Sequence, residues 1–86
     1  MDTCWVIDSG ITSYCTDNIS IFEHLTTQTG KLTTTDRALR IVGREDAIIS
    51  LLNSSIAKLA GILMVPGIGI NLLSTQALLA QGIENY

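Results

Sequence analysis

The residues of this chain best suited to chemistry lie near its start, where a carboxylate follows a short apolar run. Residues 4–7 are rich in strand formers and are stopped by Asp8-Ser9-Gly10, which predicts a buried strand that runs into a turn. Glycine allows a tight turn that brings amide N–H groups close to the carboxylate, and a neighbouring hydroxyl can fix the local geometry. The carboxylate is therefore a candidate for acid–base chemistry. Taken alone, so short a motif is more often an ordinary strand-to-turn transition.

Other residues that could do chemistry have plainer explanations. Cys4 and Cys15 lie near His24, but two cysteines and one histidine do not supply the four ligands of a typical zinc site. We therefore expect no metal and no cofactor, and two reduced, partly buried thiols, although a disulfide stays open. The pair Glu45-Asp46 is better explained as a solvated turn than as a catalytic carboxylate pair, because nothing apolar brackets it closely.

Length and composition bound the class of protein. A chain of 86 residues predicts one domain over residues 1–86, of marginal stability without a disulfide, a metal or oligomerisation. The hydrophobic fraction of 47%, with few aromatic residues, favours a partner subunit that covers part of the aliphatic surface. The net charge of −3 and the five dispersed basic residues argue against direct nucleic-acid binding.

The sequence also predicts no membrane association. Residues 1–15 lack the basic start and the long apolar core of a signal peptide. The apolar stretch over residues 62–79 is interrupted by Pro66, Gly67 and Gly69 and contains several polar residues, so it is not expected to span a membrane. We expect a soluble intracellular protein.

The elements that would position Asp8 are many short strands. The branched residues 33–35 favour extended backbone, and a turn at Asp36-Arg37 followed by a strand over 38–42 predicts a hairpin over about residues 31–42. The remaining expected elements are a strand or helical turn within 19–25, a turn or bulge at 43–46, a strand within 47–52, a turn at 53–55 and a further apolar segment over 56–65.

The C-terminal segment predicts a loop and then a helix. Residues 66–69 are expected to form a loop because they contain proline and two glycines. Asn71 is a plausible N-cap for a helix that presents Leu72 and Leu73 on an apolar face, and Gly82 is placed to end it in the left-handed conformation. Residues 83–86 could begin a final strand.

Two blocks of the sequence resemble the protease of copia-type retrotransposons, a branch of the retropepsin family. Residues 5–10 and then Thr12-Ser13 are similar to that family's Trp-Ile/Leu-Leu-Asp-Ser-Gly-Ala-Thr-Ser. Residues 63–67 and 71–74 resemble its second block, which is an apolar pair, Val-Pro-Gly, three variable residues and Asn-Leu-Leu-Ser. Between the two blocks, residues 31–36 and 41–43 resemble the family's flap hairpin and the strand after it. The matches keep the family's order and cover residues 5–82.

The resemblance implies an all-β fold: a retropepsin-like closed β-barrel subunit with a flap hairpin and one short C-terminal helix. It implies a homodimer in which each subunit supplies one Asp8 to a shared site. One carboxylate of the pair would act as general base on a water molecule, and the other, protonated, would polarise the scissile carbonyl. Ser9 would brace the pair across the dimer. Residues 65–71 would pack behind the catalytic loop, and the following helix would support it.

The resemblance also implies a substrate and a location. The substrate would be an extended polypeptide, the Gag-Pol polyprotein of the element, processed in the cytoplasm within virus-like particles. The residues implied in substrate binding are Gly10, Ile11 and Thr12 beside the carboxylate and Thr34, Thr35 and Asp36 in the flap.

Several positions depart from the family's pattern and leave a second interpretation open. Ile11 stands where alanine is usual, Tyr14 where histidine is common, and Arg37 in place of a glycine at the flap tip. Residues 43–45 lack the second glycine of the usual Gly-X-Gly. The alternative is a catalytically impaired or domesticated module of the same fold that only binds or dimerises.

Overall fold

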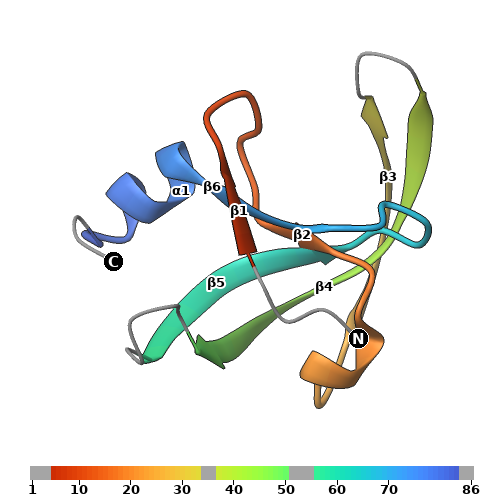
Figure 1. Cartoon of the computed structure of the whole chain (residues 1–86). Coiled ribbons are helices and arrows are strands. Elements are labelled where there is room, and N and C mark those ends of the chain that lie inside the picture. The colour runs from red at the N-terminus through yellow and green to blue at the C-terminus, as the bar shows by residue number, and fades with distance from the viewer. Residues whose placement is uncertain (1–4, 34–36, 51–55, 84–86) are drawn as a thin grey trace.

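The computed structural model describes residues 5–33, 37–50 and 56–83. Within these residues the chain is built mainly of strands, with one short α-helix near the end (Figure 1). In chain order the elements are β1 (Trp5–Asp8), β2 (Cys15–Thr16), the 3-10 helix η1 (Ile19–Ile21), β3 (Thr26–Thr33), β4 (Ala38–Ser50), β5 (Ile56–Met64), β6 (Asn71–Ser74) and α1 (Thr75–Ala80). The expected all-β class with one short C-terminal helix is confirmed.

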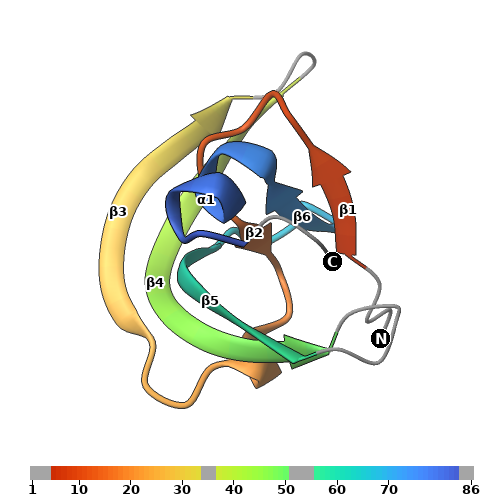
Figure 2. The same cartoon turned by 90° about the vertical axis from the view of Figure 1, so that its left-hand side faces the viewer.

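The strands form one sheet in the order β1-β6-β2-β5-β4-β3. The β1–β6 and β2–β5 pairs are parallel, whereas β2–β6, β4–β5 and β3–β4 are antiparallel. Figure 2 shows that β3, β4 and β5 curve around α1. In the described residues the sheet is open, with β1 and β3 at its edges, so the expected closure into a barrel is not seen there. The sheet order itself keeps β1 and β3 at opposite ends.

The expected hairpin is present as β3 and β4, whose register joins Thr33 to Ala38 and Lys31 to Arg40. It projects away from the rest of the sheet in Figure 1. Residues 34–36, where the flap tip was predicted, lie outside the described residues, as does the predicted turn at 53–55.

β4 is longer than the sequence predicted, because it runs without interruption through residues 43–46. The turn or bulge expected at residues 43–46 is not found on β4, because the extra residue at this level lies on β5, where Ala60 and Gly61 stand opposite Asp46. The register with β5 shifts between Glu45 and Ala47, and Gly61 on β5 has a φ of 73° at this point. Glycine adopts this left-handed conformation without the clash that a Cβ would bring, so the long pair of strands bends here and continues.

Two groups of buried side chains form the core. The first lies between the sheet and α1 and consists of Tyr14, Ala47, Ile49, Leu59, Ile62, Leu73 and Leu78. The second lies beside the 65–70 loop and consists of Cys15, Ile41, Leu63, Val65, Ile68 and Leu72. β4, β5 and β6 each contribute to both groups, so the loop that follows β1 is bordered by one continuous packed framework.

The structure corrects the prediction for residues 71–74. Asn71 is not a helix N-cap, and Leu72 and Leu73 are not helical, because these residues form β6 between β1 and β2. The N-cap is Ser74, whose Oγ accepts the N–H of Ala77. Gly82 has a φ of 82°, which confirms the expected left-handed residue after the helix. Ile83 is not in a strand.

The prediction for residues 4–7 is half right. Residues 5–8 do form a strand that runs into a turn at Ser9-Gly10, but Val6 and Ile7 are exposed, not buried. The reason is that β1 is an edge strand with β6 as its neighbour on one side only. In the segment 19–25, where a strand and a helical turn were both open, the structure has the helical turn η1.

Candidate functional site

Asp8 is the last residue of β1, and its carboxylate is held by the turn that follows. The Gly10 N–H donates to Asp8 Oδ1 at 2.7 Å, as the Asp-Ser-Gly sequence predicts. A Cβ added at Gly10 would lie 3.2 Å from the same oxygen, which is close enough to disturb it. Asp8 is half-buried, whereas Ser9 and Gly10 are exposed. The carboxylate is thus fixed on one side and open on the other.

Ser74 links the loop after Asp8 to the helix. It is the register partner of Asp8 in the β1–β6 pair, and it is fully buried. Its hydroxyl donates to the carbonyl of Ile11 at 2.8 Å and accepts the N–H of Ala77 at 3.1 Å. One side chain therefore caps α1 and holds the middle of the loop after Asp8.

Tyr14, at the far end of the loop, is tied to the end of the helix. Its hydroxyl donates to Gln81 Oε1 at 2.6 Å, and the same oxygen accepts the N–H of Ala60. Gln81 Nε2 in turn donates to the carbonyl of Lys58 at 2.9 Å. Burial raises the pKa of the Tyr14 phenol above its usual value, so it stays a neutral donor. Sequence reasoning missed Gln81, because an exposed glutamine after a helix carries no signal of its own.

A buried polar pair joins the end of β2 to the start of β6. Thr16 Oγ1 donates to Asn71 Oδ1 at 2.6 Å, and both residues are buried. The same Thr16 oxygen accepts the N–H of Asn18 at 3.0 Å. Buried polar groups are costly unless they are satisfied in this way, so the pair fixes how β2 enters the sheet.

Cys15 lies between these two contacts as a free, fully buried thiol. Burial and the negative charge of Asp8 raise its pKa to about 11. The thiol is therefore protonated at neutral pH and is a poor nucleophile. Cys4, the other predicted thiol, lies outside the described residues.

The residues predicted to bind substrate differ in exposure, and three of them lie outside the described residues. Thr12 and Gly10 are exposed beside Asp8. Ile11 is half-buried and packs against the second core group, so part of its bulk points into the protein. Thr34, Thr35 and Asp36 lie outside the described residues.

The carboxylates of the acidic pair at residues 45–46 accept hydrogen bonds from backbone N–H groups. Glu45 Oε2 accepts the N–H groups of Glu23 and His24 at 2.9 and 3.0 Å, and Asp46 Oδ1 accepts that of Gly61 at 2.8 Å. His24 itself is exposed. Within the described ranges, no group of three or more His, Cys, Asp or Glu side chains could hold a metal ion. No helix in those ranges is long and apolar enough to cross a membrane.

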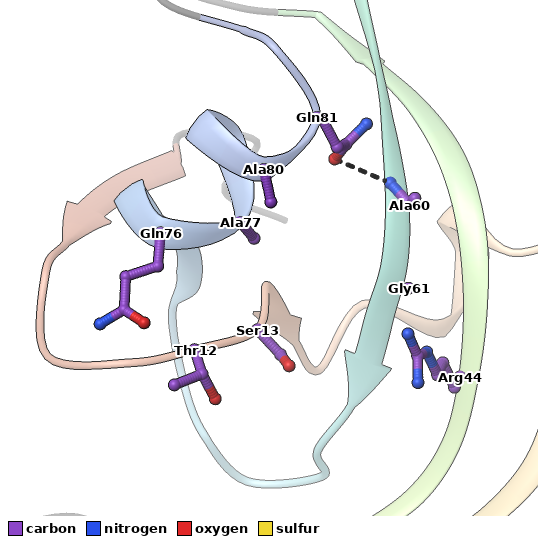
Figure 3. A pocket seen from close by; sticks show the side chains of 9 residues that line it. All are labelled: Thr12, Ser13, Arg44, Ala60, Gly61, Gln76, Ala77, Ala80 and Gln81. Carbon is purple, nitrogen blue, oxygen red and sulfur yellow. Dashed lines mark hydrogen bonds between the residues drawn. The ribbon is translucent and has the colours of Figure 1, made fainter.

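Described residues line several surface pockets, of which three are large enough to hold a small ligand. One of about 360 Å³ lies between α1, the loop after Asp8 and the bulge in β5 (Figure 3). A second of about 370 Å³ lies around Glu45 and Lys58, and a third of about 300 Å³ lies between Trp5 and Ile48. Asp8 lines none of these three. In the single subunit, Asp8 therefore does not contribute to any of these pockets.

Comparison with known families gives a match over residues 5–83, nearly the whole chain, to the family described as "Pol polyprotein, beta-barrel domain". The chain belongs to this family. It is a Pol-related domain of a retroelement, which confirms the expected retroelement origin. No curated protein and no solved structure gives a significant match. The matched span of the Pol beta-barrel domain contains Asp8 together with Ser74 and Gln81, the residues that fix the loop after it.

Proposed function

We propose that this Pol domain is the aspartic endopeptidase of a copia-type retrotransposon and that it is active as a homodimer. The observation that carries the proposal is the fixed carboxylate of Asp8, bonded to the Gly10 N–H at 2.7 Å at the exposed end of an edge strand. Membership of a polyprotein family adds a substrate, because a polyprotein must be cut to release its parts. On the resemblance, that substrate is the Gag-Pol polyprotein in cytoplasmic virus-like particles.

The need for a second subunit follows from the chemistry and is supported by the surface of β1. Hydrolysis by carboxylates requires one group as base and another as acid, and the motif supplies only Asp8. Val6 and Ile7, which lead into Asp8, are large apolar residues left half exposed on an open sheet edge. Ser9 is exposed, and within the described residues its side chain makes no hydrogen bond. A second copy that covers this edge would bury the apolar pair and bring the two carboxylates together.

In the proposed reaction the two Asp8 carboxylates share one proton. The ionised carboxylate takes a proton from a water molecule while the water oxygen bonds to the scissile carbonyl carbon. At the same time the protonated carboxylic acid gives its proton to the carbonyl oxygen. The carboxylic acid formed from the base then gives its proton to the amide nitrogen as the C–N bond breaks. The other carboxylate takes the proton of one hydroxyl as the carbonyl of the acid product re-forms, which restores the shared proton. The main chain around Gly10 and Thr12 would hold the extended peptide, with the β3–β4 hairpin closing over it.

The first test is cleavage of a panel of extended peptides between pH 4 and 7 at several protein concentrations. We expect the rate to rise more steeply than linearly with concentration, because the site is completed by dimerisation, and to peak within the acid range, because both proton states are needed. Asp8→Asn should abolish cleavage. Asp46→Asn is the matched control, because it changes another carboxylate on the sheet, and it should leave the rate unchanged.

Mixing the two proteins tests the shared site directly. A mixed dimer holds one carboxylate where two are needed, so added Asp8→Asn protein should inhibit the wild type by more than simple dilution. If the wild type cleaves but added mutant has no effect, the dimeric mechanism is wrong. If the folded wild type cleaves nothing at any concentration, the enzyme proposal is wrong.

One contact favours the second candidate, a module that keeps the fold but not the activity. Arg37, which the resemblance places at the flap tip and which immediately precedes β4, donates from Nη2 to the carbonyl of Ile68 at 3.3 Å. This bond ties the hairpin to the 65–70 loop, whereas a flap must move to admit a peptide. An inert wild type that gains cleavage on Arg37→Gly would support this candidate. If neither the wild type nor Arg37→Gly cleaves peptides but both still dimerise, the result would support a module that only dimerises.

A further inference from the structure

The pocket drawn in Figure 3 contains the charge of one arginine and no carboxylate. Its nine lining residues are Thr12, Ser13, Arg44, Ala60, Gly61, Gln76, Ala77, Ala80 and Gln81. Arg44 is the one charged residue among them, in a chain with eight acidic and five basic residues. The floor is the backbone of Ala60 and Gly61, and the walls are α1 on one side and the loop after Asp8 on another.

The position of the Arg44 side chain is built into the sheet. A Cβ on Gly61 would lie 2.5 Å from Arg44 Nη2 and 2.8 Å from Nε, so the guanidinium rests on the space that this glycine leaves. Gly61 also has a φ of 73°, at the bulge opposite Asp46. Asp46 Oδ1 accepts the Gly61 N–H, and within the described residues Arg44 forms no ion pair. The Gly61 bulge therefore makes room for the guanidinium and also bonds the carboxylate opposite it.

The hydrogen-bonding groups that face the pocket are unused. In the part of the chain that the structure describes, no hydrogen bond or ion pair is formed by the side chains of Arg44, Thr12, Ser13 or Gln76. Gln81, by contrast, is bonded through both ends of its amide, with Oε1 accepting from Tyr14 and Ala60 and Nε2 donating to Lys58. The Arg44 guanidinium therefore has two hydroxyls and an amide close by, and within the described residues none of these side chains has a hydrogen-bond partner.

We propose that this pocket binds a carboxylate, supplied by an acidic side chain or by the C-terminus of a peptide. The planar fork of a guanidinium matches the two oxygens of a carboxylate. One cation balances one carboxylate, whereas a phosphate dianion would leave net negative charge in an already acidic protein. The assignment does not depend on catalysis by Asp8. If the proposed protease function also holds, then the neighbouring Thr12 and Ser13 place the pocket beside the bound peptide, and an acidic residue there would lower KM.

The test uses three small probes with the full chain carrying Asp8→Asn, so that no cleavage can occur. N-acetyl-glutamate N-methylamide offers a side-chain carboxylate, N-acetyl-alanine offers a terminal carboxylate, and N-acetyl-glutamine N-methylamide is the neutral control. Binding is followed by the NMR signals of the Arg44 Nε–H and the side-chain amide of Gln76. We expect saturable shifts with at least one carboxylate and an affinity about tenfold or more above the neutral probe. The carboxylate that binds identifies the source.

Two variants complete the experiment. Arg44→Gln should remove the binding while leaving the fold intact, because the side chain is exposed. Arg40→Gln is the matched control, since it removes an exposed arginine from the same strand outside the pocket, and binding should persist. Equal shifts with the neutral probe, no saturable shift with either carboxylate, or equal loss in both variants would overturn the proposal. None of these results depends on whether the wild type cleaves peptides.

Discussion

β1 and β6 are paired residue for residue, yet they lie in opposite environments. Val6 is beside Leu72 and Ile7 is beside Leu73 in a parallel register. Val6 and Ile7 are 50% and 52% exposed, whereas Leu72 and Leu73 are 8% and 2% exposed. Both strands carry two adjacent aliphatic residues, so the difference comes from position in the sheet. β6 has neighbours on both sides, and β1 has β6 alone.

The comparison separates the residues that make the fold from those that would do chemistry. In the strand that bears Asp8, Trp5 packs against the first core group, but Val6 and Ile7 contribute little buried area. The strand beside it contributes both leucines and the Ser74 hydroxyl that holds the loop. A retroelement domain built in this way can keep its fold when Val6 or Ile7 is altered. It can also present β1 to a second subunit without giving up its own core.

The largest contrast should come from shortening one side chain on each strand. Leu73→Ala removes a fully buried side chain from the first core group and should lower the free energy of unfolding by about 2–5 kcal/mol. Ile7→Ala, at the neighbouring position on β1, should cost less than about 1 kcal/mol, because half of the side chain is already in water. Urea denaturation at low protein concentration measures both, and equal losses would show that β1 belongs to the core.

The second contrast concerns β2, the other neighbour of β6. Cys15 lies opposite Leu72, and its thiol pKa is raised from 9.0 to about 11. A pKa higher by about two units lowers the thiolate fraction at pH 8 about 100-fold. In a Cys4→Ser protein, which has Cys15 alone, the folded state should therefore be alkylated more slowly than the urea-unfolded state by at least about that factor. Rapid alkylation of the folded protein would show that β2 opens as readily as an edge strand.

The same thiol predicts a pH dependence with a definite sign. The folded state holds the Cys15 proton more tightly than the unfolded state, so its contribution to stability is complete below about pH 9 and is lost as the pH rises to about 11. Cys15→Ala should reduce the fall in stability over that range, as measured by urea denaturation at a series of pH values. The loss that remains is expected from Tyr14, whose raised pKa acts in the same direction at higher pH.

A smaller effect is expected at the ends of the two strands, where Asp8 and Ser74 share a register position. Ser74→Ala removes the helix N-cap and the bond to the Ile11 carbonyl and should cost about 1–2 kcal/mol of stability. Asp8→Asn should change stability by less than this, while removing all cleavage if the proposed function holds. A stable Ser74→Ala protein with full cleavage would show that the loop needs no support from β6.

Much of the fold around Asp8 could be predicted from local sequence. The Asp8-Ser9-Gly10 turn, the hairpin that begins at β3 and the left-handed Gly82 each depend on neighbouring residues, and each is found. The resemblance of the two sequence blocks predicts that Asp8 and the 71–74 segment lie close together, and the register of β1 with β6 makes them neighbours.

The errors arose where tertiary position overrides local preference. Asn71-Leu72-Leu73 has the capping residue and apolar spacing of a helix start, but pairing with β1 and β2 makes it a strand. Residues 43–46 have turn-forming types, but the bulge at Gly61 lets β4 pass through them. The contacts of Gln81 with Tyr14 and Lys58 join residues far apart in sequence, and no single-chain pattern indicates them.

The smallest change in the subunit should have its main effect between subunits. Val6→Thr keeps the β-branched shape and alters a half-exposed side chain, so we expect less than about 0.5 kcal/mol of change in subunit stability. Because β1 is proposed to be covered by the second copy, the same change buries a hydroxyl in the dimer and should raise the dimer Kd several-fold. Ile48→Thr is the matched control, since Ile48 is 69% exposed on β4, away from that edge. Analytical ultracentrifugation of the three proteins separates the outcomes: equal Kd values would place the interface elsewhere, and a weaker dimer for Val6→Thr alone would place it on the strand that carries Asp8.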